Sequence, residues 1–182
     1  MTEDTKKILF SGQLNIYYGQ FYFDMADEDN IDEDMLLPET AFNGQENGIC
    51  GAVQKGKLFF VTGISDGIIN INVDLHMPEP PVDETYGEVV EVPFQRGEEP
   101  VALCEWAAEA THNLDLPAGN FRVRYCIDGM DKDYDEASDF DAPLPGQRHL
   151  IQIWSSEAKP DKVVKQSSDM AAYWHKQWGG WS

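Results

Sequence analysis

The chain has 182 residues and a formal net charge of −20, from 33 acidic and 13 basic side chains. A charge of this sign and size favours solubility, disfavours binding to nucleic acid or anionic membranes, and favours cations and basic protein surfaces as partners. Because 42% of the residues are hydrophobic, a single folded domain over residues 1–182 is expected and a disordered acidic tail is excluded.

The cysteines predict a reducing compartment. Cys50, Cys104 and Cys126 are odd in number and widely spaced, and no Cys-x-x-Cys pair occurs. This pattern favours free thiols that pack as small hydrophobic side chains, without a disulfide framework or a zinc site. The first residues contain no apolar stretch of signal-peptide length, and no apolar run is long enough to span a membrane. We therefore expect a cytoplasmic protein.

Short apolar segments, several with period-two alternation and separated by glycine and proline, predict β-strands through most of the chain. The expected strands cover residues 8–10, 14–23, 47–53, 57–64, 68–75, 88–94, 101–106, 121–125 and 148–154. Gly19 suggests a bulge or bend within its strand. The Ser65-Asp66-Gly67 sequence is typical of a hairpin turn. Pro93 suggests an edge or a strand end, and the three prolines within residues 77–81 exclude that segment from a sheet interior.

The segment 114–125 is the clearest of these signals. Pro117 and Gly119 predict a turn, after which residues 121–125 alternate strictly. The alternation places three apolar side chains on the core face and directs Arg122 and Arg124 toward water.

The C-terminal extension, residues 156–182, differs in composition from the strands. Ser168 is positioned as the N-cap of a short helix over residues 169–175. Trp174, Trp178 and Trp181 are too apolar to remain in solvent, so we expect the tail to pack on the rest of the domain or on a partner.

These elements together predict an all-β fold, an antiparallel β-sandwich of about eight or nine strands with a short C-terminal helix and a tryptophan-rich tail. Two acidic loops, residues 24–39 and 128–141, interrupt the strands.

The acidic loops are the candidate partner-binding residues. Residues 24–39 hold eight carboxylates and no basic residue, and residues 128–141 hold seven with one lysine. A third run, residues 79–99, also holds seven. The three runs either line one surface or form separate solvated loops. If the three runs lie on one surface, they would imitate duplex DNA, which has one negative charge about every 1.7 Å along its axis. Such a surface would bind a basic protein quickly and with strong salt dependence. The carboxylates we expect to carry this binding are Asp27, Glu28, Asp29, Asp32, Glu33, Asp34, Asp131, Asp133 and Asp135.

The same second loop contains a weak candidate Ca²⁺ site. Asp131, Asp133 and Asp135 have the spacing that opens an EF-hand loop. Glu136 stands where the loop needs glycine, and Ala142 where it needs a bidentate glutamate, so an EF-hand is excluded. A looser Ca²⁺ site and a solvated acidic loop both remain open, and no other cofactor is expected.

No catalytic signature occurs in the sequence. The nucleophile elbow, the dinucleotide-binding glycine motif and the phosphate-binding loop are all absent, and the four histidines are scattered. We therefore expect a protein that is not an enzyme. A binding module for Ca²⁺ or a small ligand is the alternative, and an enzyme whose site is assembled across strands is a third.

Four segments occur here in the order in which they occur in a known family. They are Leu-Asn-Ile-Tyr-Tyr-Gly-Gln-Phe from residue 14, Asn-Gly-Ile-Cys-Gly-Ala from residue 47, Val-Pro-Phe from residue 92 and Leu-Asp-Leu-Pro-Ala-Gly-Asn-Phe from residue 114. By this order the chain resembles the ComJ-like group of bacterial proteins, named for competence protein J, an inhibitor of the DNA-entry nuclease. The resemblance implies an inhibitor or immunity-type factor that masks a basic nuclease or toxin. The two acidic loops and the tryptophan-rich tail depart from the family pattern.

Overall fold

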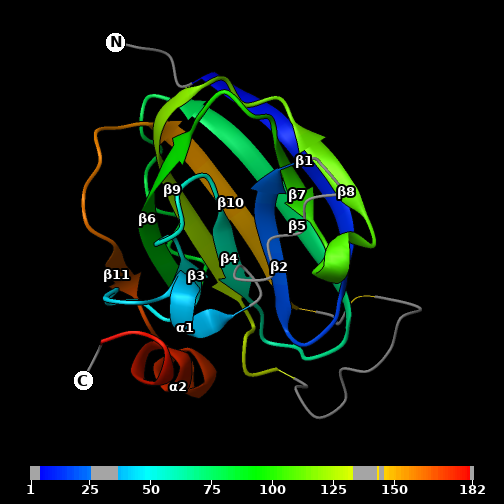
Figure 1. Cartoon of the computed structure of the whole chain (residues 1–182). Helices are drawn as coiled ribbons and strands as arrows, with labels where there is room; N and C mark the ends of the chain where they lie inside the picture. Colours follow the sequence, from blue (N-terminus) through cyan, green and yellow to red (C-terminus); the bar gives the residue numbers. More distant parts are fainter. Residues whose placement is uncertain (1–4, 26–36, 133–142, 144–145, 181–182) are drawn as a thin grey trace.

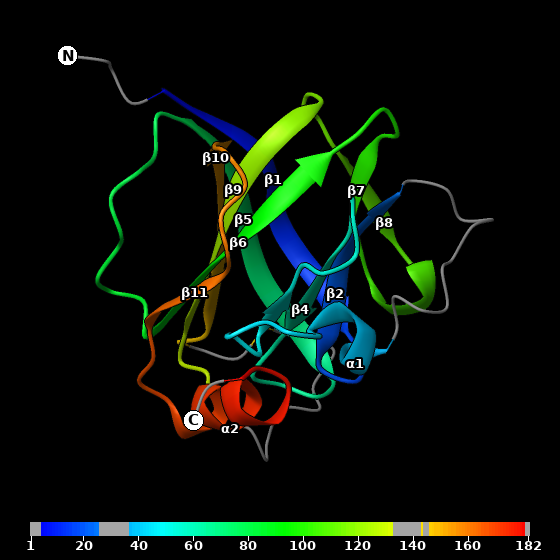
Figure 2. The same cartoon turned by 60° about the vertical axis from the view of Figure 1, so that its left-hand side comes forward.

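Two facing β-sheets form the body of the molecule (Figures 1 and 2). The computed structural model describes residues 5–25, 37–132, 143 and 146–180. One sheet has the strand order β1-β5-β10-β9-β6-β11 and the other β3-β4-β2-β7-β8. The predicted β-sandwich is therefore confirmed. The pairing is antiparallel throughout except between β5 and β10, which run parallel.

The described residues form eleven strands and three helices, more strands than the eight or nine expected. The six-stranded sheet contains β1 (Thr5–Ile16), β5 (Gly67–Met77), β10 (Arg148–Ser155), β9 (Gly119–Asp128), β6 (Glu88–Arg96) and β11 (Lys162–Lys165). The five-stranded sheet contains β3 (Cys50–Gly51), β4 (Leu58–Val61), β2 (Gln20–Met25), β7 (Val101–Cys104) and β8 (Thr111–Leu114). The helices are α1 (Pro38–Ala41), the 3₁₀ helix η2 (Trp106–Ala108) and α2 (Asp169–Gln177).

Two connections that were predicted to stay within one sheet instead join strands of different sheets. Tyr18 and Gly19 both have positive φ, 59° and 69°, as a tight type I′ turn requires. The segment predicted as one bent strand over residues 14–23 is therefore two strands, β1 and β2, in different sheets. The Ser65-Asp66-Gly67 connection likewise joins β4 of one sheet to β5 of the other, and no hairpin forms there. Turn residues mark where the chain reverses, but they do not show which sheet it enters.

The prediction for Pro93 is confirmed. Strand β11 pairs with β6 only from Val89 to Glu91. Pro93 therefore lies where β6 is the free edge of the sheet, the position at which a missing backbone N–H costs no ladder hydrogen bond.

Strand β9 supplies the centre of the core, as its alternation predicts. Tyr125 is fully buried between the sheets, and its ring lies 5.9 Å from Phe21 and 5.0 Å from Phe60. Its hydroxyl donates a hydrogen bond of 3.1 Å to the carbonyl of Val61. The aromatic side chains of the two sheets therefore interlock around this strand.

The other face of β9 is not in water, and the expectation for its arginines is wrong. Arg124 is 1% exposed, because the proline-rich segment after β5 crosses the outer face of the six-stranded sheet and covers it. Arg122 is also buried, and its guanidinium donates to the carbonyl of Lys159 at 2.9 Å. The Arg124 guanidinium donates to Glu91 at 2.9 and 3.0 Å, to the carbonyl of Pro80 at 2.9 Å and to Gln152 at 3.1 Å. The guanidinium carbon of Arg124 lies 4.8 Å from the centre of the Trp154 ring. A paired arginine thus holds the covering segment in place.

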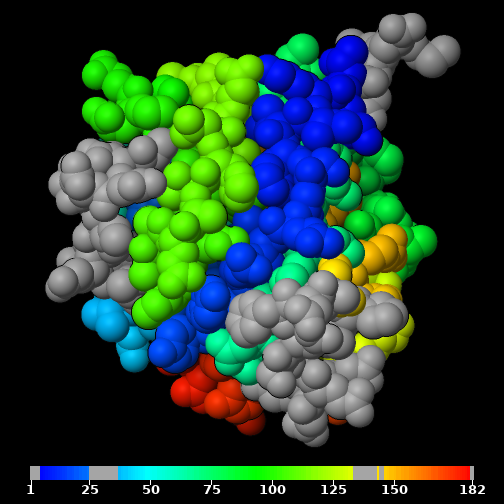
Figure 3. Space-filling view, turned by 90° about the vertical axis from the view of Figure 1, so that its right-hand side faces the viewer, coloured from blue at the N-terminus to red at the C-terminus, as the bar shows by residue number. Residues whose placement is uncertain are grey.

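On one side of the sandwich the edges of the two sheets meet, where β1 runs beside β8 (Figure 3). The rings of Phe10 and His112 are 4.7 Å apart. The amide of Asn15 donates to the buried carboxylate of Glu105 at 2.8 Å. Side-chain contacts close this side, although no backbone ladder joins the two strands.

The start of α2 is fixed by three acceptors. The Ser168 hydroxyl caps the helix by accepting from the amide of residue 171 at 3.0 Å, so the predicted N-cap is confirmed. The carboxylate of Glu88, buried in β6, accepts from the amides of Ser167 and Ser168 at 3.1 and 2.6 Å. Asp131 accepts from the amides of Asp169 and Met170 at 2.9 and 3.0 Å.

The body of α2 rests on the segment before β3. Nδ1 of the buried His175 accepts from the amide of Gly48 at 2.9 Å. A Cβ added to Gly48 would lie only 1.8 Å from the carbonyl oxygen of Trp174, so the close approach requires glycine. Trp174 and Trp178 pack against the main core with their rings stacked 5.9 Å apart. The tail therefore packs on the domain through these two residues, while Trp181 lies outside the described residues.

The cysteines are confirmed as buried free thiols. Burial raises the pKa of Cys104 and of Cys126 to about 12, so both are neutral near pH 7. In the described part of the chain, no helix is both long enough and apolar enough to cross a membrane.

Replacing Arg124 by alanine should destabilise the fold by about 3 kcal/mol, because it removes the closer of the two arginine partners of Glu91 and the buried donors to Pro80 and Gln152. Arg148→Ala is the matched control. That arginine also pairs with a carboxylate, at 3.2 Å, and stacks on Tyr86, but 45% of its side chain is exposed. We expect the control to lose about 1 kcal/mol. Urea unfolding measures the free energy of unfolding of both variants. Equal losses of stability would show that the burial of Arg124 does not determine its contribution.

Replacing His175 by asparagine should flatten the pH dependence of stability. Burial lowers the pKa of His175 to about 4, whereas an unfolded chain has a histidine pKa of about 6.5. Between these values the unfolded state binds the extra proton, so stability falls as the pH falls from 6.5 to 4. Asparagine Oδ1 keeps an acceptor for the Gly48 amide but does not titrate. Thermal unfolding across this pH range should therefore show a shallower decline for the variant, and parallel curves would refute the assignment.

Candidate functional site

A narrow groove lies between α2 and the outer face of the five-stranded sheet, and we call it the α2 groove. It encloses about 190 Å³. Its walls come from the β1–β2 turn, the start of α1, β4 with the connection after it, and α2. The lining residues are Tyr18, Gly19, Gln20, Pro38, Phe59, Val61, Thr62, Ile64, Ser65, Met170, Trp174 and Trp178.

The α2 groove is mainly apolar and aromatic. Phe59 and Val61 point away from the core between the sheets and are buried. Trp174 and Trp178 are half-buried and stack against each other. At the rim, the side chain of Tyr18 is 70% exposed.

Hydrogen bonds hold the wall opposite α2 in one conformation. The amide of Gly19 donates to the carbonyl of Ser65 at 2.7 Å, and the amide of Thr62 donates to the carbonyl of Gly19 at 2.9 Å. The Thr62 hydroxyl donates to the carbonyl of Ile64 at 2.7 Å. Because α2 is itself anchored at both ends, the groove is formed before any partner arrives.

The charges around the α2 groove are acidic. Three of the lining residues are adjacent in sequence to an acidic residue. Glu39 follows Pro38, Asp66 follows Ser65, and Asp169 precedes Met170. All three carboxylates are exposed or half-exposed. Among the described lining residues there is no lysine or arginine.

The described ends of the two predicted acidic loops meet at this groove. Pro38, from the loop at residues 24–39, lines it together with Met170. Asp131, from the loop at residues 128–141, binds the amide of Met170. Figures 1 and 2 show α1 and α2 at the same end of the sandwich. Segments about 90 residues apart in sequence thus converge on the first turn of α2.

Most of the predicted partner-binding residues are not described. Asp27, Glu28, Asp29, Asp32, Glu33, Asp34, Asp133 and Asp135 all lie outside the described residues. Asp131 is described, and both of its carboxylate oxygens accept from amides of α2. To become a Ca²⁺ ligand with the other two predicted aspartates, it would have to compete with these bonds. The described residues contain no group of three or more potential ligands placed to hold a metal ion.

The third acidic run, residues 79–99, does not form a single surface. Glu88 is buried beneath the start of α2, and Glu91 pairs with Arg124. Glu98 and Glu99 are exposed in the connection between β6 and β7. Part of the carboxylate count therefore belongs to the interior of the fold.

A larger hollow, of about 670 Å³, lies on the six-stranded sheet beside Thr5, the first residue of β1. Figures 1 and 2 show that β1 begins at the end of the sandwich opposite α2. It is lined by Thr5, His76, Met77, Pro78, Glu79, Trp154, Ser155 and Ser156. Asp74, buried on the same sheet face, has its pKa raised by burial, with Lys6 and His76 opposing the shift. No local sequence pattern indicates this site, because its residues come from three separate segments.

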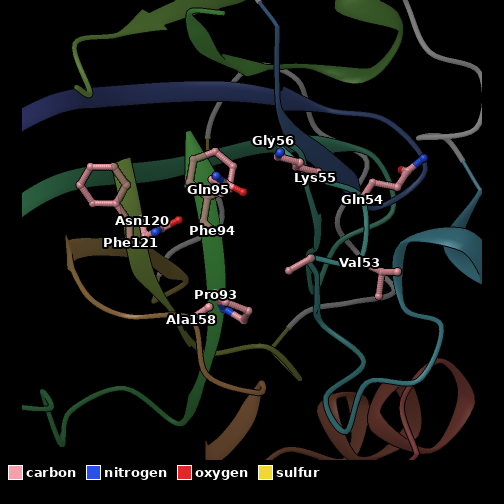
Figure 4. A pocket seen from close by; sticks show the side chains of 11 residues that line it. Val53, Gln54, Lys55, Gly56, Pro93, Phe94, Gln95, Asn120, Phe121 and Ala158 are labelled. Carbon is pink, nitrogen blue, oxygen red and sulfur yellow. The ribbon is translucent and has the colours of Figure 1, made fainter. Parts of the chain in front are cut away.

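A third hollow, of about 230 Å³, opens between the β3–β4 turn and the strands β6 and β9 (Figure 4). Val53, Gln54 and Lys55 line one side of it, and Phe94 and Gln95 line the other. Lys55 is its only charged lining residue among those described. This hollow does not fit a basic partner.

Two solved structures share this fold. ComJ from Bacillus subtilis, an inhibitor of the DNA degrading activity of NucA, matches 84% of this chain and 99% of its own, with a TM-score of 0.51 and 15% identity. The protein described as crocagin biosynthetic gene J also matches 84% of this chain and 99% of its own, with a TM-score of 0.57 and 13% identity. No protein-family model matches the chain, and no curated protein matches it in sequence. The resemblance to the ComJ-like group indicated by the order of the sequence segments is therefore confirmed at the level of the fold.

Proposed function

We propose that this chain is a non-enzymatic cytoplasmic inhibitor or immunity-type factor that binds and masks a basic protein, a nuclease or toxin. The observation that carries the proposal is the convergence of both acidic segments on α2, where Pro38 lines the α2 groove together with Met170 and Asp131 accepts from the amide of Met170. The fold shared with ComJ, an inhibitor of a nuclease, supports it.

The charge distribution fits this role. The net charge of −20 attracts a basic surface over a long range and accelerates association. A nuclease has a basic cleft for DNA phosphates, and clustered carboxylates offer that cleft the same sign of charge. We propose that Asp27, Glu28, Asp29, Asp32, Glu33 and Asp34, with Asp133 and Asp135, carry this attraction.

The described ionisable side chains support a binding role. Burial lowers the pKa of His149 and of His175 to about 4, so both are neutral near pH 7. His175 accepts a backbone hydrogen bond, and Glu88 and Glu91 hold structural partners. These groups are engaged in the scaffold and are not arranged around the α2 groove as an acid and a base.

Neutralising the first acidic cluster should weaken inhibition and its salt dependence. The substitutions are Asp27→Asn, Glu28→Gln, Asp29→Asn, Asp32→Asn, Glu33→Gln and Asp34→Asn. NucA is the first nuclease to test, followed by basic nucleases isolated from the source cell by salt elution. We expect stoichiometric inhibition of DNA degradation by the parent chain. The variant should bind at least tenfold more weakly at low salt, with a smaller change between 50 and 300 mM salt.

The matched control removes six exposed charges outside the two acidic loops. Its substitutions replace Glu79, Glu84, Glu98, Glu99, Glu109 and Glu157 by glutamine, and all six residues are exposed. A second variant, Asp133→Asn with Asp135→Asn, tests the other loop while sparing Asp131 as a helix cap. If the parent inhibits no nuclease and retains no basic toxin from the source cell at low salt, the proposed function is wrong. If the control loses as much binding as the first variant, only net charge matters and the assigned carboxylates are wrong.

The hollow on the six-stranded sheet supports a second candidate function, small-ligand binding. Its volume of about 670 Å³ lies within the usual range for ligand pockets, roughly 300–1,000 Å³. A library of small polar heterocycles, screened by thermal shift, tests this function. A shift that Ser155→Arg abolishes would locate the ligand there, and the absence of any shift would remove this candidate. A calorimetric Ca²⁺ titration without heat would likewise remove the Ca²⁺ alternative at Asp131, Asp133 and Asp135.

A further inference from the structure

We propose that the α2 groove receives one large apolar side chain of the partner, a leucine, methionine or aromatic residue, from a segment in which lysines or arginines flank it. This proposal rests on the proposed function, because the partner is the same basic protein. It adds an apolar contact to the electrostatic attraction. Trp174, Trp178 and Met170 of this chain would form the surface that contacts the partner's apolar side chain.

The size of the groove favours a protein side chain. Its volume of about 190 Å³ is below the roughly 300 Å³ at which pockets for small-molecule ligands begin. It is large enough for one bulky side chain. Protein interfaces place their strongest contacts in pockets of this kind, which bury a single anchor residue and exclude water around it.

The lining favours an apolar anchor. The buried Phe59 and Val61 and the stacked rings of Trp174 and Trp178 offer hydrophobic surface. Met170 adds a flexible side chain that adapts to the shape of what it contacts. Aromatic residues and methionine are enriched at the centres of interfaces, while charged residues gather at the rim.

The rim favours basic neighbours for that anchor. Glu39, Asp66 and Asp169 follow or precede lining residues in sequence, and all are accessible to solvent. A lysine or arginine next to the anchor would reach these carboxylates, whereas an acidic residue would be repelled. An apolar segment without basic neighbours would gain only the contacts inside the groove.

Two peptides of equal charge test the anchor directly. The first is acetyl-Lys-Lys-Lys-Leu-Lys-Lys-Lys-amide, and the second has serine in place of leucine. Isothermal titration into the full chain at 50 mM salt should give at least about tenfold tighter binding for the leucine peptide, because only its central side chain gains from burial. The ratio should persist at 300 mM salt while both affinities fall, because salt screens only the flanking charges.

Substitutions at the groove rim then locate the effect. Ser65 is exposed and lines the α2 groove, so Ser65→Arg places a positive charge at its edge and should abolish the preference for leucine. Ser155→Arg is the control, because this exposed serine lines the other hollow and the charge change is identical. Trp174→Phe removes part of the apolar wall of the groove and should reduce the preference for leucine.

The outcomes separate this proposal from the proposed function. Equal binding of the two peptides, or a leucine preference that survives Ser65→Arg, overturns the anchor and leaves nuclease inhibition to stand on its own assay. Binding of neither peptide also overturns the anchor. A dimer in sedimentation that Ser65→Arg dissociates would assign the groove to a second copy of the chain, and would equally overturn it.

Discussion

The α2 groove depends on one close approach, between Gly48 and the carbonyl of Trp174. A helix of nine residues is too short to be stable alone in water, so α2 exists because other elements hold it. Glu88 and Asp131 bind the amides at its start, and His175 binds the segment before β3. The absence of a side chain at Gly48 allows all these contacts to form together. The same contacts that stabilise the helix therefore set the width of the groove.

A second set of buried polar contacts determines which surfaces remain available. Arg124 draws the proline-rich segment onto the six-stranded sheet by donating to the carbonyl of Pro80. Prolines lack an N–H, so this segment can cross the sheet face without leaving its own donors unsatisfied. Glu91 balances the charge of the arginine beneath it. Much of that sheet face is thus closed by the chain itself, and several of the 33 acidic residues serve the interior.

Local sequence signals predicted the strands and the helix start well, because alternation and capping depend on near neighbours. The N-cap at Ser168 and the core face of β9 are examples. What could not be predicted depends on distant partners. Arg124 reads as a solvent-facing residue by its alternation, since the segment that covers it lies more than 40 residues away. The α2 groove likewise joins four separate segments. The tryptophans indicated an apolar contact, but only the fold shows that Asp131 binds the first turn of the same helix.

Acidic loops and an aromatic groove contribute differently to binding. Long-range attraction raises the rate of encounter with a basic surface, but salt screens it and many basic proteins share it. Affinity among related complexes is set mostly by the rate of dissociation, which depends on close-packed contacts. An acidic surface alone would therefore bind basic proteins with little discrimination. Under the proposed function, Trp174 and Trp178, which lie on the helix where the ends of both acidic segments converge, would retain one partner among the many that the charge attracts. Selectivity in this chain would then come from the fit of a single apolar side chain, with the carboxylates bringing candidates to the groove.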